Sequence, residues 1–246
     1  MAINVNTVYQ TVLLILNKEQ RGYMTPAEFN RVGTQVQLQI FEKYFEDLNQ
    51  QLRVPQTNTD YADRVENLDD KIAIFKTYGT PTYDTAYFTL PTADDYGQTV
   101  SFYRLGTVLY NTDTLVDRVD RTRFYYADRS RLTKPTKEFP VYLYENEKIY
   151  VKPTSIISDI TIDYIRQPRE VVWGFNVGNL GQYTYNPTQY DATDQPTGSQ
   201  QFELHASEQA ELILKILMYA GIVIRDPQVI EAAAAQVQSE EINTKS

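Results

Sequence analysis

The sequence predicts an α+β protein in which an N- and C-terminal helical bundle carries a β-rich central insertion. Two observations lead to this fold class. Apolar residues recur every three or four positions near both ends of the chain, whereas aromatic and β-branched residues alternate with polar ones in the middle. We expect four segments: helices at 1–78, the β-rich region at 79–172, a long polar loop at 173–202 and closing helices at 203–246.

The first segment is predicted to hold three helices. The second begins at Thr25 and Pro26, because Thr25 can cap a helix, Pro26 suits its first position and Glu28 can reach back in a capping box. Pro55 ends it. The third helix is centred on residues 65–75. The first helix has an apolar stripe of Val5, Val8, Val12 and Ile15.

The middle of the chain is typical of strands. Residues 83–90 and 100–110 are aromatic and β-branched, and residues 140–152 predict a hairpin that turns at residues 145–147. In the strand at 159–166, Ile160, Ile162 and Tyr164 alternate with polar residues and are expected to be buried. A short helix is expected at 120–132.

The closing segment is predicted to hold two helices, the first capped by Ser207 and the second opened by Asp226 and Pro227. The first is apolar nearly all round and must be buried, either in the core of this chain or partly against another subunit. The residues expected to face inward are Ala210, Ile213, Leu214 and Leu217.

Few residues in the sequence could carry chemistry. Cysteine is absent and His205 is the single histidine, which we interpret as an ordinary helix-start or surface residue. Nucleotide-binding and nucleophile motifs are missing. The acidic pairs at 69–70, 94–95 and 145/147 are interpreted as solvated charges. We therefore expect no enzyme activity, no cofactor and no metal. No stretch reaches the roughly 18 apolar residues of a membrane span, so no membrane contact is expected.

Charge is unevenly distributed along the chain, whose net charge is −9. Residues 118–137 hold seven basic residues against two acidic ones, and residues 42–70 hold eight acidic residues against three basic ones. The candidate subunit contacts of the basic segment are Arg118, Arg121, Arg123, Arg129, Arg131, Lys134 and Lys137. Those of the acidic segment are Glu42, Glu46, Asp47, Asp60 and Asp63.

Three interpretations of the basic segment remain open. Its cations are interleaved with aromatic residues and could bind nucleic acid, could contact an acidic patch on a neighbouring subunit, or could form a solvated helix face. The chain also has 20 Tyr against 10 Phe, a composition typical of contact surfaces. In the long polar loop, Tyr183, Tyr185 and Tyr190 are the candidate partner-contacting residues.

The stretch at 17–30, NKEQRGYMTPAEFN, resembles the beginning of virion structural proteins of tailed bacteriophages, notably crAss-like phages. Similar patterns recur at 90–96, 103–105, 130–136, 140–142, 149–153 and 162–168, so that the resemblance covers about residues 1–172. The motif at 17–30 is fairly specific, and the later pattern is shared by many phage connector-like proteins.

The resemblance implies a head-to-tail adaptor fold and a ring subunit of the connector, without catalytic residues. Its implied partners are copies of itself in a dodecameric ring that matches the portal, the portal protein, other tail ring proteins, and DNA that passes through the channel without sequence-specific binding. The implied location is the connector region of the virion, after synthesis in the host cytoplasm. The alternatives are another minor virion protein associated with the capsid or tail tube, and a nucleic-acid-binding module.

Overall fold

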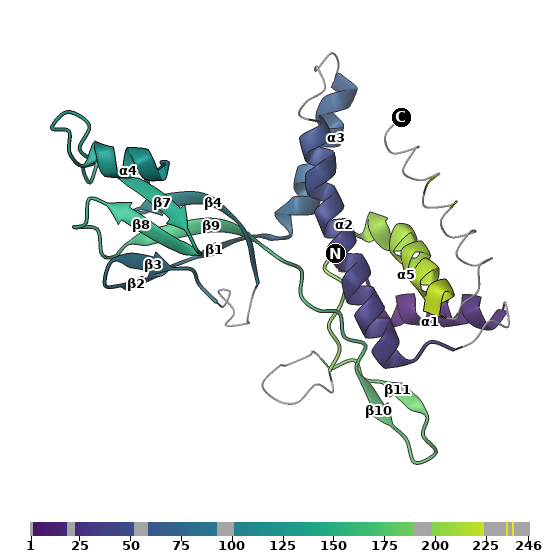
Figure 1. Cartoon of the computed structure of the whole chain (residues 1–246). Coiled ribbons are helices and arrows are strands. Elements are labelled where there is room, and N and C mark those ends of the chain that lie inside the picture. Colours follow the sequence, from purple (N-terminus) through teal and green to yellow (C-terminus); the bar gives the residue numbers. More distant parts are fainter. Residues whose placement is uncertain are drawn as a thin grey trace. The chain divides into compact units, whose positions relative to one another are not determined.

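The computed structural model describes residues 2–18, 23–51, 59–92, 101–188 and 198–223, together with Ala235 and Gln238. Of residues 50, 51, 59–64, 222 and 223 it describes the backbone alone. The chain divides into two compact units (Figure 1). Unit 1 comprises residues 1–74 and 168–246, and unit 2 comprises residues 75–167.

The three predicted N-terminal helices are confirmed in unit 1. They are α1 (Val5–Lys18), α2 (Pro26–Gln51) and α3 (Thr59–Ala73). The predicted capping box is also confirmed: the backbone N–H of Thr25 donates to Oε2 of Glu28 at 2.9 Å, and the N–H of Glu28 donates to Oγ1 of Thr25 at 3.3 Å. Two donors that the first turn leaves without helical partners are thereby satisfied.

Near the C-terminus, the short helix η1 (Ala206–Glu208) leads into α5 (Gln209–Val223). The cap is His205, whose Nδ1 accepts the N–H of Ser207, where the sequence predicted a Ser207 cap. The predicted inward face is confirmed only in part: Leu217 is buried, Ile213 and Leu214 are half-buried, and Ala210 is exposed. The fully buried residues of α5 include Leu212, Ile216 and Ala220. A helix that is apolar nearly all round gives no stripe from which its orientation can be read. The predicted final helix, from residue 226, lies outside the described residues except at Ala235, which is helical, as is Gln238 beyond it.

Two extended segments, at residues 169–173 and 199–204, contribute buried side chains to the core of unit 1. They are joined to each other and to the N-terminus by the bridges Val172–Gln200 and Ile3–Phe202. The fully buried Gln37 of α2 binds both: its Nε2 donates to the carbonyl of Arg169 at 2.7 Å, and its Oε1 accepts the N–H of Glu203 at 2.9 Å. A Cβ on Gly33 would lie 3.3 Å from the Phe202 ring, so glycine lets the extended segment approach α2 closely.

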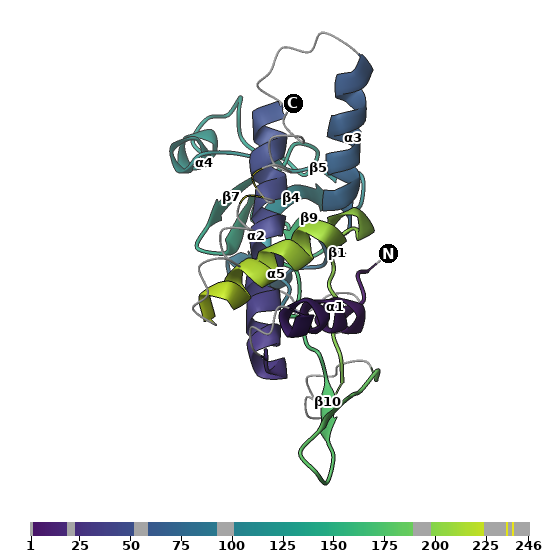
Figure 2. The same ribbon diagram turned by 90° about the vertical axis from the view of Figure 1, so that its right-hand side faces the viewer.

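The predicted N- and C-terminal helical bundle is wrong. The protein is mixed α/β with a sheet-rich core, and its helices, at the N-terminus and near the C-terminus, do not form a clear bundle. In Figure 2, α5 crosses α2 obliquely, where bundle neighbours would lie nearly parallel. The physical reason is that the core of unit 1 is not built by helices alone: Trp173, Phe202 and Leu204, all from extended segments, are also buried.

The described residues of unit 2 form two sheets. The first has the order β1-β9-β4-β5, and the second has the order β2-β3-β8-β7-β6. Every neighbouring pair is antiparallel except β6 and β7, which are parallel. The strands are β1 (Lys76–Gly79), β2 (Thr82–Asp84), β3 (Tyr87–Thr89), β4 (Phe102–Tyr110), β5 (Thr114–Leu115), β6 (Asp117–Arg118), β7 (Val141–Glu145), β8 (Lys148–Lys152) and β9 (Ile160–Arg166).

Side chains from both sheets form the core of unit 2. In β9 the predicted burial of Ile160, Ile162 and Tyr164 is confirmed. The predicted hairpin is β7–β8, in which Glu145 pairs with Lys148, and the positive φ angles of Asn146 and Glu147 suit a two-residue turn. The predicted helix at 120–132 is shorter: α4 spans Arg121–Ala127, and turns and bends follow it.

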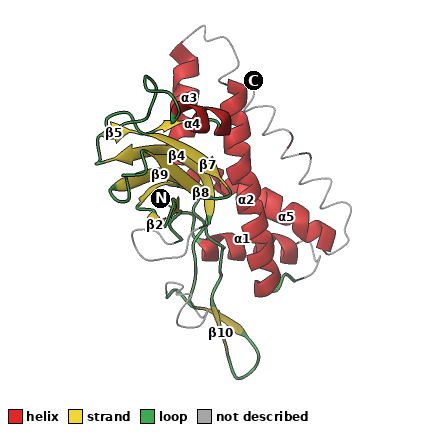
Figure 3. Cartoon of the chain, turned by 60° about the vertical axis from the view of Figure 1, so that its left-hand side comes forward, coloured by secondary structure: helices red, strands yellow, loops and turns green. Residues whose placement is uncertain are grey.

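The stretch predicted as a long polar loop contains a hairpin in unit 1. Its strands are β10 (Phe175–Val177) and β11 (Tyr183–Tyr185), seen as a yellow pair that extends away from the red helices of its unit in Figure 3. The cross-strand pairs place Phe175, Val177, Tyr183 and Tyr185 on one face. An apolar face and a regular hairpin thus replace an irregular loop over residues 175–185.

Candidate functional site

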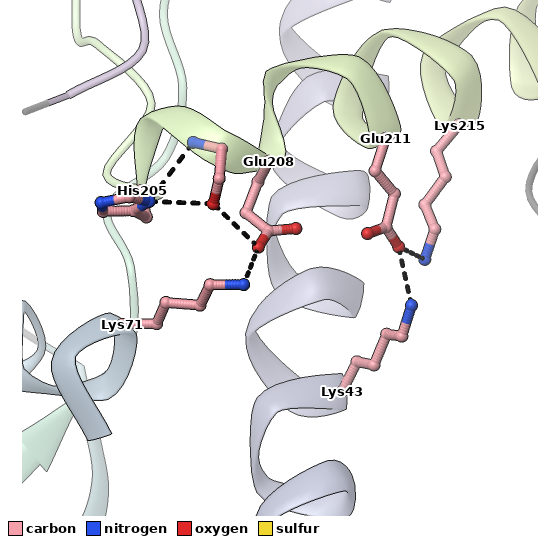
Figure 4. A network of polar contacts seen from close by, with 7 residues as sticks. Lys43, Lys71, His205, Glu208, Glu211 and Lys215 are labelled. Carbon is pink, nitrogen blue, oxygen red and sulfur yellow. Dashed lines mark hydrogen bonds and ion pairs between the residues drawn. The ribbon is translucent and has the colours of Figure 1, made fainter. Parts of the chain in front are cut away.

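The residues most suited to catalysis do not converge in the described part of the chain. His205 is exposed and acts as a cap, with Nδ1 2.9 Å from Oγ of Ser207 (Figure 4). Asp69 and Asp70 are exposed on α3, and Asp94 and Asp95 lie outside the described residues. The described residues contain no group of three His, Cys, Asp or Glu side chains that could hold a metal ion.

The basic surface comprises residues 118–137 of unit 2, from the last residue of β6 through α4 to the turns that follow it. All seven of its predicted contact residues, Arg118, Arg121, Arg123, Arg129, Arg131, Lys134 and Lys137, are exposed. Within the part of the chain that the structure describes, Arg121 alone among them forms an ion pair, with Glu145 at 3.6 Å. The positive charge of the basic surface is therefore concentrated on exposed side chains, although unit 2 as a whole holds twelve basic and twelve acidic residues.

Phe124 anchors α4 to the sheet. Its ring is buried, and Lys152 of β8 places its Nζ 4.6 Å from the ring centroid and 3.1 Å from Oδ2 of Asp128. This cation–π contact and ion pair hold the helix by both its buried side and its C-terminal end. These contacts therefore hold α4, and with it the basic surface, against β8.

Apolar side chains project among these cations. Tyr125 and Tyr126 are exposed on α4, Leu132 is 97% exposed, and Phe139 is 75% exposed directly after the basic segment. When a partner covers such an exposed apolar side chain, the complex is stabilised by about 25 cal/mol for each Å² of apolar surface removed from water. Charge and exposed apolar area together make the basic surface suited to contact with a macromolecule.

The acidic surface lies on α2 and α3 of unit 1. Glu42 and Glu46 are exposed, and Asp47 is half-buried. Asp60 and Asp63 lie in α3, but the structure describes only the backbone of these two residues. Three further acids of α3 are exposed, namely Glu66, Asp69 and Asp70. One chain thus carries a basic surface on unit 2 and an acidic surface on unit 1.

A charge network that the sequence analysis did not predict joins the helices of unit 1 (Figure 4). Lys43 of α2 contacts Oε1 of Glu211 at 3.0 Å, and Lys215 contacts the same oxygen at 3.2 Å. Lys71 of α3 pairs with Glu208 of η1. The one signal in the sequence was the spacing of Glu211 and Lys215, four residues apart in an apolar helix. These contacts position the acidic surface by tying α2 to α5 and α3 to η1.

The tyrosines predicted to contact a partner lie on the β10–β11 hairpin. Tyr183 is exposed and Tyr185 is half-buried, with its ring centroid 5.7 Å from that of Trp173. Tyr190 lies outside the described residues. The hairpin is a third surface, and it is uncharged.

No protein-family model matches the chain, and no curated protein is significantly similar to it. Among the described residues, no helix is both long and apolar enough to cross a membrane.

Proposed function

We propose that this chain is a structural subunit of the head-to-tail connector of a tailed bacteriophage. In this function copies of the chain form a ring, dodecameric to match the portal, that joins the portal to further tail ring proteins and surrounds the DNA channel. The resemblance of residues 17–30 to phage virion proteins supports the class of particle. The observation that carries the ring is the pair of oppositely charged, exposed surfaces on one chain.

A closed ring repeats one heterologous contact, so each subunit needs two different surfaces that fit each other. The basic surface, 118–137, and the acidic surface on α2 and α3 are of opposite charge and belong to different units. Each would contact its counterpart on the next copy. Opposite potentials of this kind steer association and select the correct partner. The net charge of −9 is compatible with a channel through which DNA passes without adhering.

A charge-reversal pair tests the ring contact. Arg129→Glu with Arg131→Glu in one variant, or Glu42→Lys with Glu46→Lys in another, should each weaken the assembly, and mixing the two should restore it in part. Arg31→Glu, an exposed reversal on α2 away from the acidic residues, is the control. Native mass spectrometry measures the oligomers. Wild-type assembly by both single-surface variants would refute the charged contact.

Quantitative mass spectrometry of purified virions tests the place of the chain in the particle. A copy number near that of the portal protein supports the connector ring. A much higher ratio identifies a capsid or tail-tube component, which is the alternative virion function. Absence from the virion would reject both.

A nucleic-acid-binding module is a second candidate, favoured by the exposed rings of Tyr125 and Tyr126 among the cations of α4. Exposed aromatic rings can stack on bases while nearby cations contact phosphates. This function requires DNA binding that weakens steeply with salt and is lost in the double variant Arg121→Glu, Arg123→Glu. Binding that is absent at low salt would exclude it.

A further inference from the structure

Unit 2 is a single stretch of chain inserted into unit 1. Unit 1 is made of residues 1–74 and 168–246, so the backbone passes between the units after residue 74 and again after residue 167. These two ends of unit 2 lie side by side, because β1 and β9 are antiparallel neighbours in which Lys76 pairs with Ile165. A stretch whose ends already meet does not need the rest of the chain to hold them together.

The pairing continues to the last residues of unit 2. The N–H of Arg166 donates to the carbonyl of Phe75 at 3.0 Å, and the N–H of Gln167 donates to the carbonyl of Ser101 at 2.8 Å. The guanidinium carbon of Arg166 also lies 5.9 Å from the centroid of the Phe75 ring, at a distance suited to a cation–π contact. Both ends of the insertion are therefore fixed by residues of unit 2 itself.

Unit 2 also has a core of its own. The buried side chains of this core come from residues 88–164 and include Phe88, Val108, Ile149, Ile160 and Ile162. They are contributed by both sheets, whose strands lie within unit 2. With about 90 residues, unit 2 has the size at which a single apolar core sustains an independent fold. The structure thus meets the physical requirements of an autonomous domain.

Each charged surface is built inside one unit. Phe124, which anchors α4, and the ion pair of Lys152 with Asp128 all belong to unit 2. The ion pairs that tie α2 to α5 and α3 to η1 belong to unit 1. Separating the units would therefore leave each surface with the contacts that position it.

We propose that unit 2 is an autonomously folding module that carries one half of the ring contact, so that residues 75–167 alone bind the acidic surface of an intact chain and end its assembly. The inference rests on the proposed ring, in which every subunit uses both of its charged surfaces. A separate unit 2 supplies the basic surface but offers no acidic surface to the next copy. With this fragment in excess every acidic surface is occupied, and opposite charge selects that binding site.

Independent unfolding is tested in the intact chain, because Trp173 is its only tryptophan and belongs to unit 1. Its fluorescence in urea follows unit 1, and amide exchange of peptides from residues 75–167, measured by mass spectrometry, follows unit 2. Ile162→Ala, in the core of unit 2, should raise the unfolding equilibrium constant of that unit at least about thirtyfold and leave the Trp173 transition unchanged.

Ile40→Ala, at an equally buried isoleucine of α2, is the matched variant and should have the reverse effect. It should shift the Trp173 transition and leave amide exchange in unit 2 unchanged. An Ile162→Ala variant whose Trp173 transition moves together with the exchange of unit 2 would overturn the autonomous module.

Native mass spectrometry of the intact chain mixed with residues 75–167 tests termination, after circular dichroism of the fragment has been compared with that expected for its strands. The expected product is one fragment bound to one chain in place of larger oligomers, and 0.5 M salt should weaken this binding at least about tenfold. The fragment with Arg129→Glu and Arg131→Glu is the control, which should fold, because both side chains are exposed, and should not bind. A wild-type fragment that does not fold, or that folds and does not bind, overturns the inference.

The outcomes separate this inference from the proposed function. Rings of portal-like copy number formed by a chain whose units unfold together overturn the module and leave the connector function standing. Such rings together with a folded fragment that does not bind overturn termination and assign the ring contact to other surfaces. A chain that is absent from virions but binds the fragment rejects the connector and retains the module with its contact.

Discussion

The rings of Tyr9 in α1 and Trp173 before β10 lie with their centroids 4.6 Å apart. The first helix and the base of the hairpin therefore share one aromatic cluster, which Phe29 of α2 joins at 4.7 Å from Tyr9. Aromatic pairs at this spacing contribute about 0.5–1.5 kcal/mol beyond the area that they bury. The cluster couples the position of the hairpin to the folding of unit 1.

Replacing the tryptophan should test this coupling. Trp173→Ala is expected to lower the free energy of unfolding by about 3–5 kcal/mol, the range for a large aromatic side chain removed from a core. Trp173 is 4% exposed, and the substitution also removes the hydrogen bond from its Nε1 to Asn6. Urea denaturation followed by circular dichroism measures the loss. Phe139→Ala, at an exposed aromatic residue, should change stability little, and equal effects would contradict the role of the cluster.

The buried amide of Gln37 should contribute as much to the free energy of unfolding as an apolar core side chain. Gln37→Ala leaves the carbonyl of Arg169 and the N–H of Glu203 without this partner, and an unsatisfied buried group costs about 1–3 kcal/mol. Faster amide exchange at Glu203 and lower global stability are expected. Gln35→Ala, at an exposed glutamine of the same helix, serves as the control. Unchanged exchange at Glu203 would contradict the bridging role.

Local signals predicted much of this fold. The capping box at Thr25 and the alternation in β9 follow from contacts between near neighbours in sequence, which spacing alone reveals. The position of α5 could not be predicted, because a helix that is apolar nearly all round has no preferred face until its neighbours are known. The bundle prediction failed because the contact of Phe202 with Gly33 joins segments about 170 residues apart.

The sequence predicted some features of the candidate surfaces and not others. The cluster of cations at 118–137 is visible in the sequence, whereas the exposure of Leu132 and Phe139 depends on where α4 ends. The hairpin was missed because Gly, Asn and Gln dominate its composition, although Gly178 and Gly181 mark its turn. The charge network needed α2, α3 and α5 to meet, and no periodicity in one helix predicts that.

The Glu211 carboxylate should make unit 1 sensitive to acid. Burial alone would raise its pKa, but the contacts with Lys43 and Lys215 outweigh burial and lower the pKa below 4.5. The folded chain then binds this proton less readily than the unfolded chain does. Its stabilising contribution is therefore present above pH of about 4.5 and is lost as the pH falls through the lowered pKa.

Glu211→Gln should reduce stability at pH 7 by about 1–3 kcal/mol, less than for a fully buried pair because the carboxylate is partly exposed to solvent. Its stability should also fall less steeply below pH 4.5 than that of the wild type. Chemical denaturation from pH 3 to pH 7 measures both effects. Glu66→Gln, at an exposed glutamate of α3, is the control. If the free energy of unfolding falls below pH 4.5 as steeply in the variant as in the wild type, Glu211 does not cause this pH dependence.

Tyr44 should make the folding stability of unit 1 fall at alkaline pH. Its side chain is buried beneath the network, and its hydroxyl has no hydrogen-bond partner among the described residues. Burial raises the pKa of Tyr44 above 10.0, and the nearby carboxylates of Glu208 and Glu211 raise it further. The folded chain therefore keeps this proton longer than the unfolded chain, so the stability is complete below pH of about 10 and is lost as the pH rises.

Tyr44→Phe should consequently raise stability by about 1 kcal/mol at pH 7, because it removes a buried hydroxyl that lacks a partner while keeping the ring that Lys71 faces at 5.7 Å. Above pH 10 its advantage should grow, since phenylalanine has no proton to release. Urea denaturation at pH 7 and pH 10.5 measures both effects, and Tyr126→Phe, at an exposed ring, is the control. A loss of stability at pH 7 would mean that the hydroxyl of Tyr44 is hydrogen-bonded in the folded protein. An equal loss of stability at pH 10.5 in the variant and the wild type would assign the alkaline dependence to another group, of which Tyr9 is the first candidate because burial also raises its pKa.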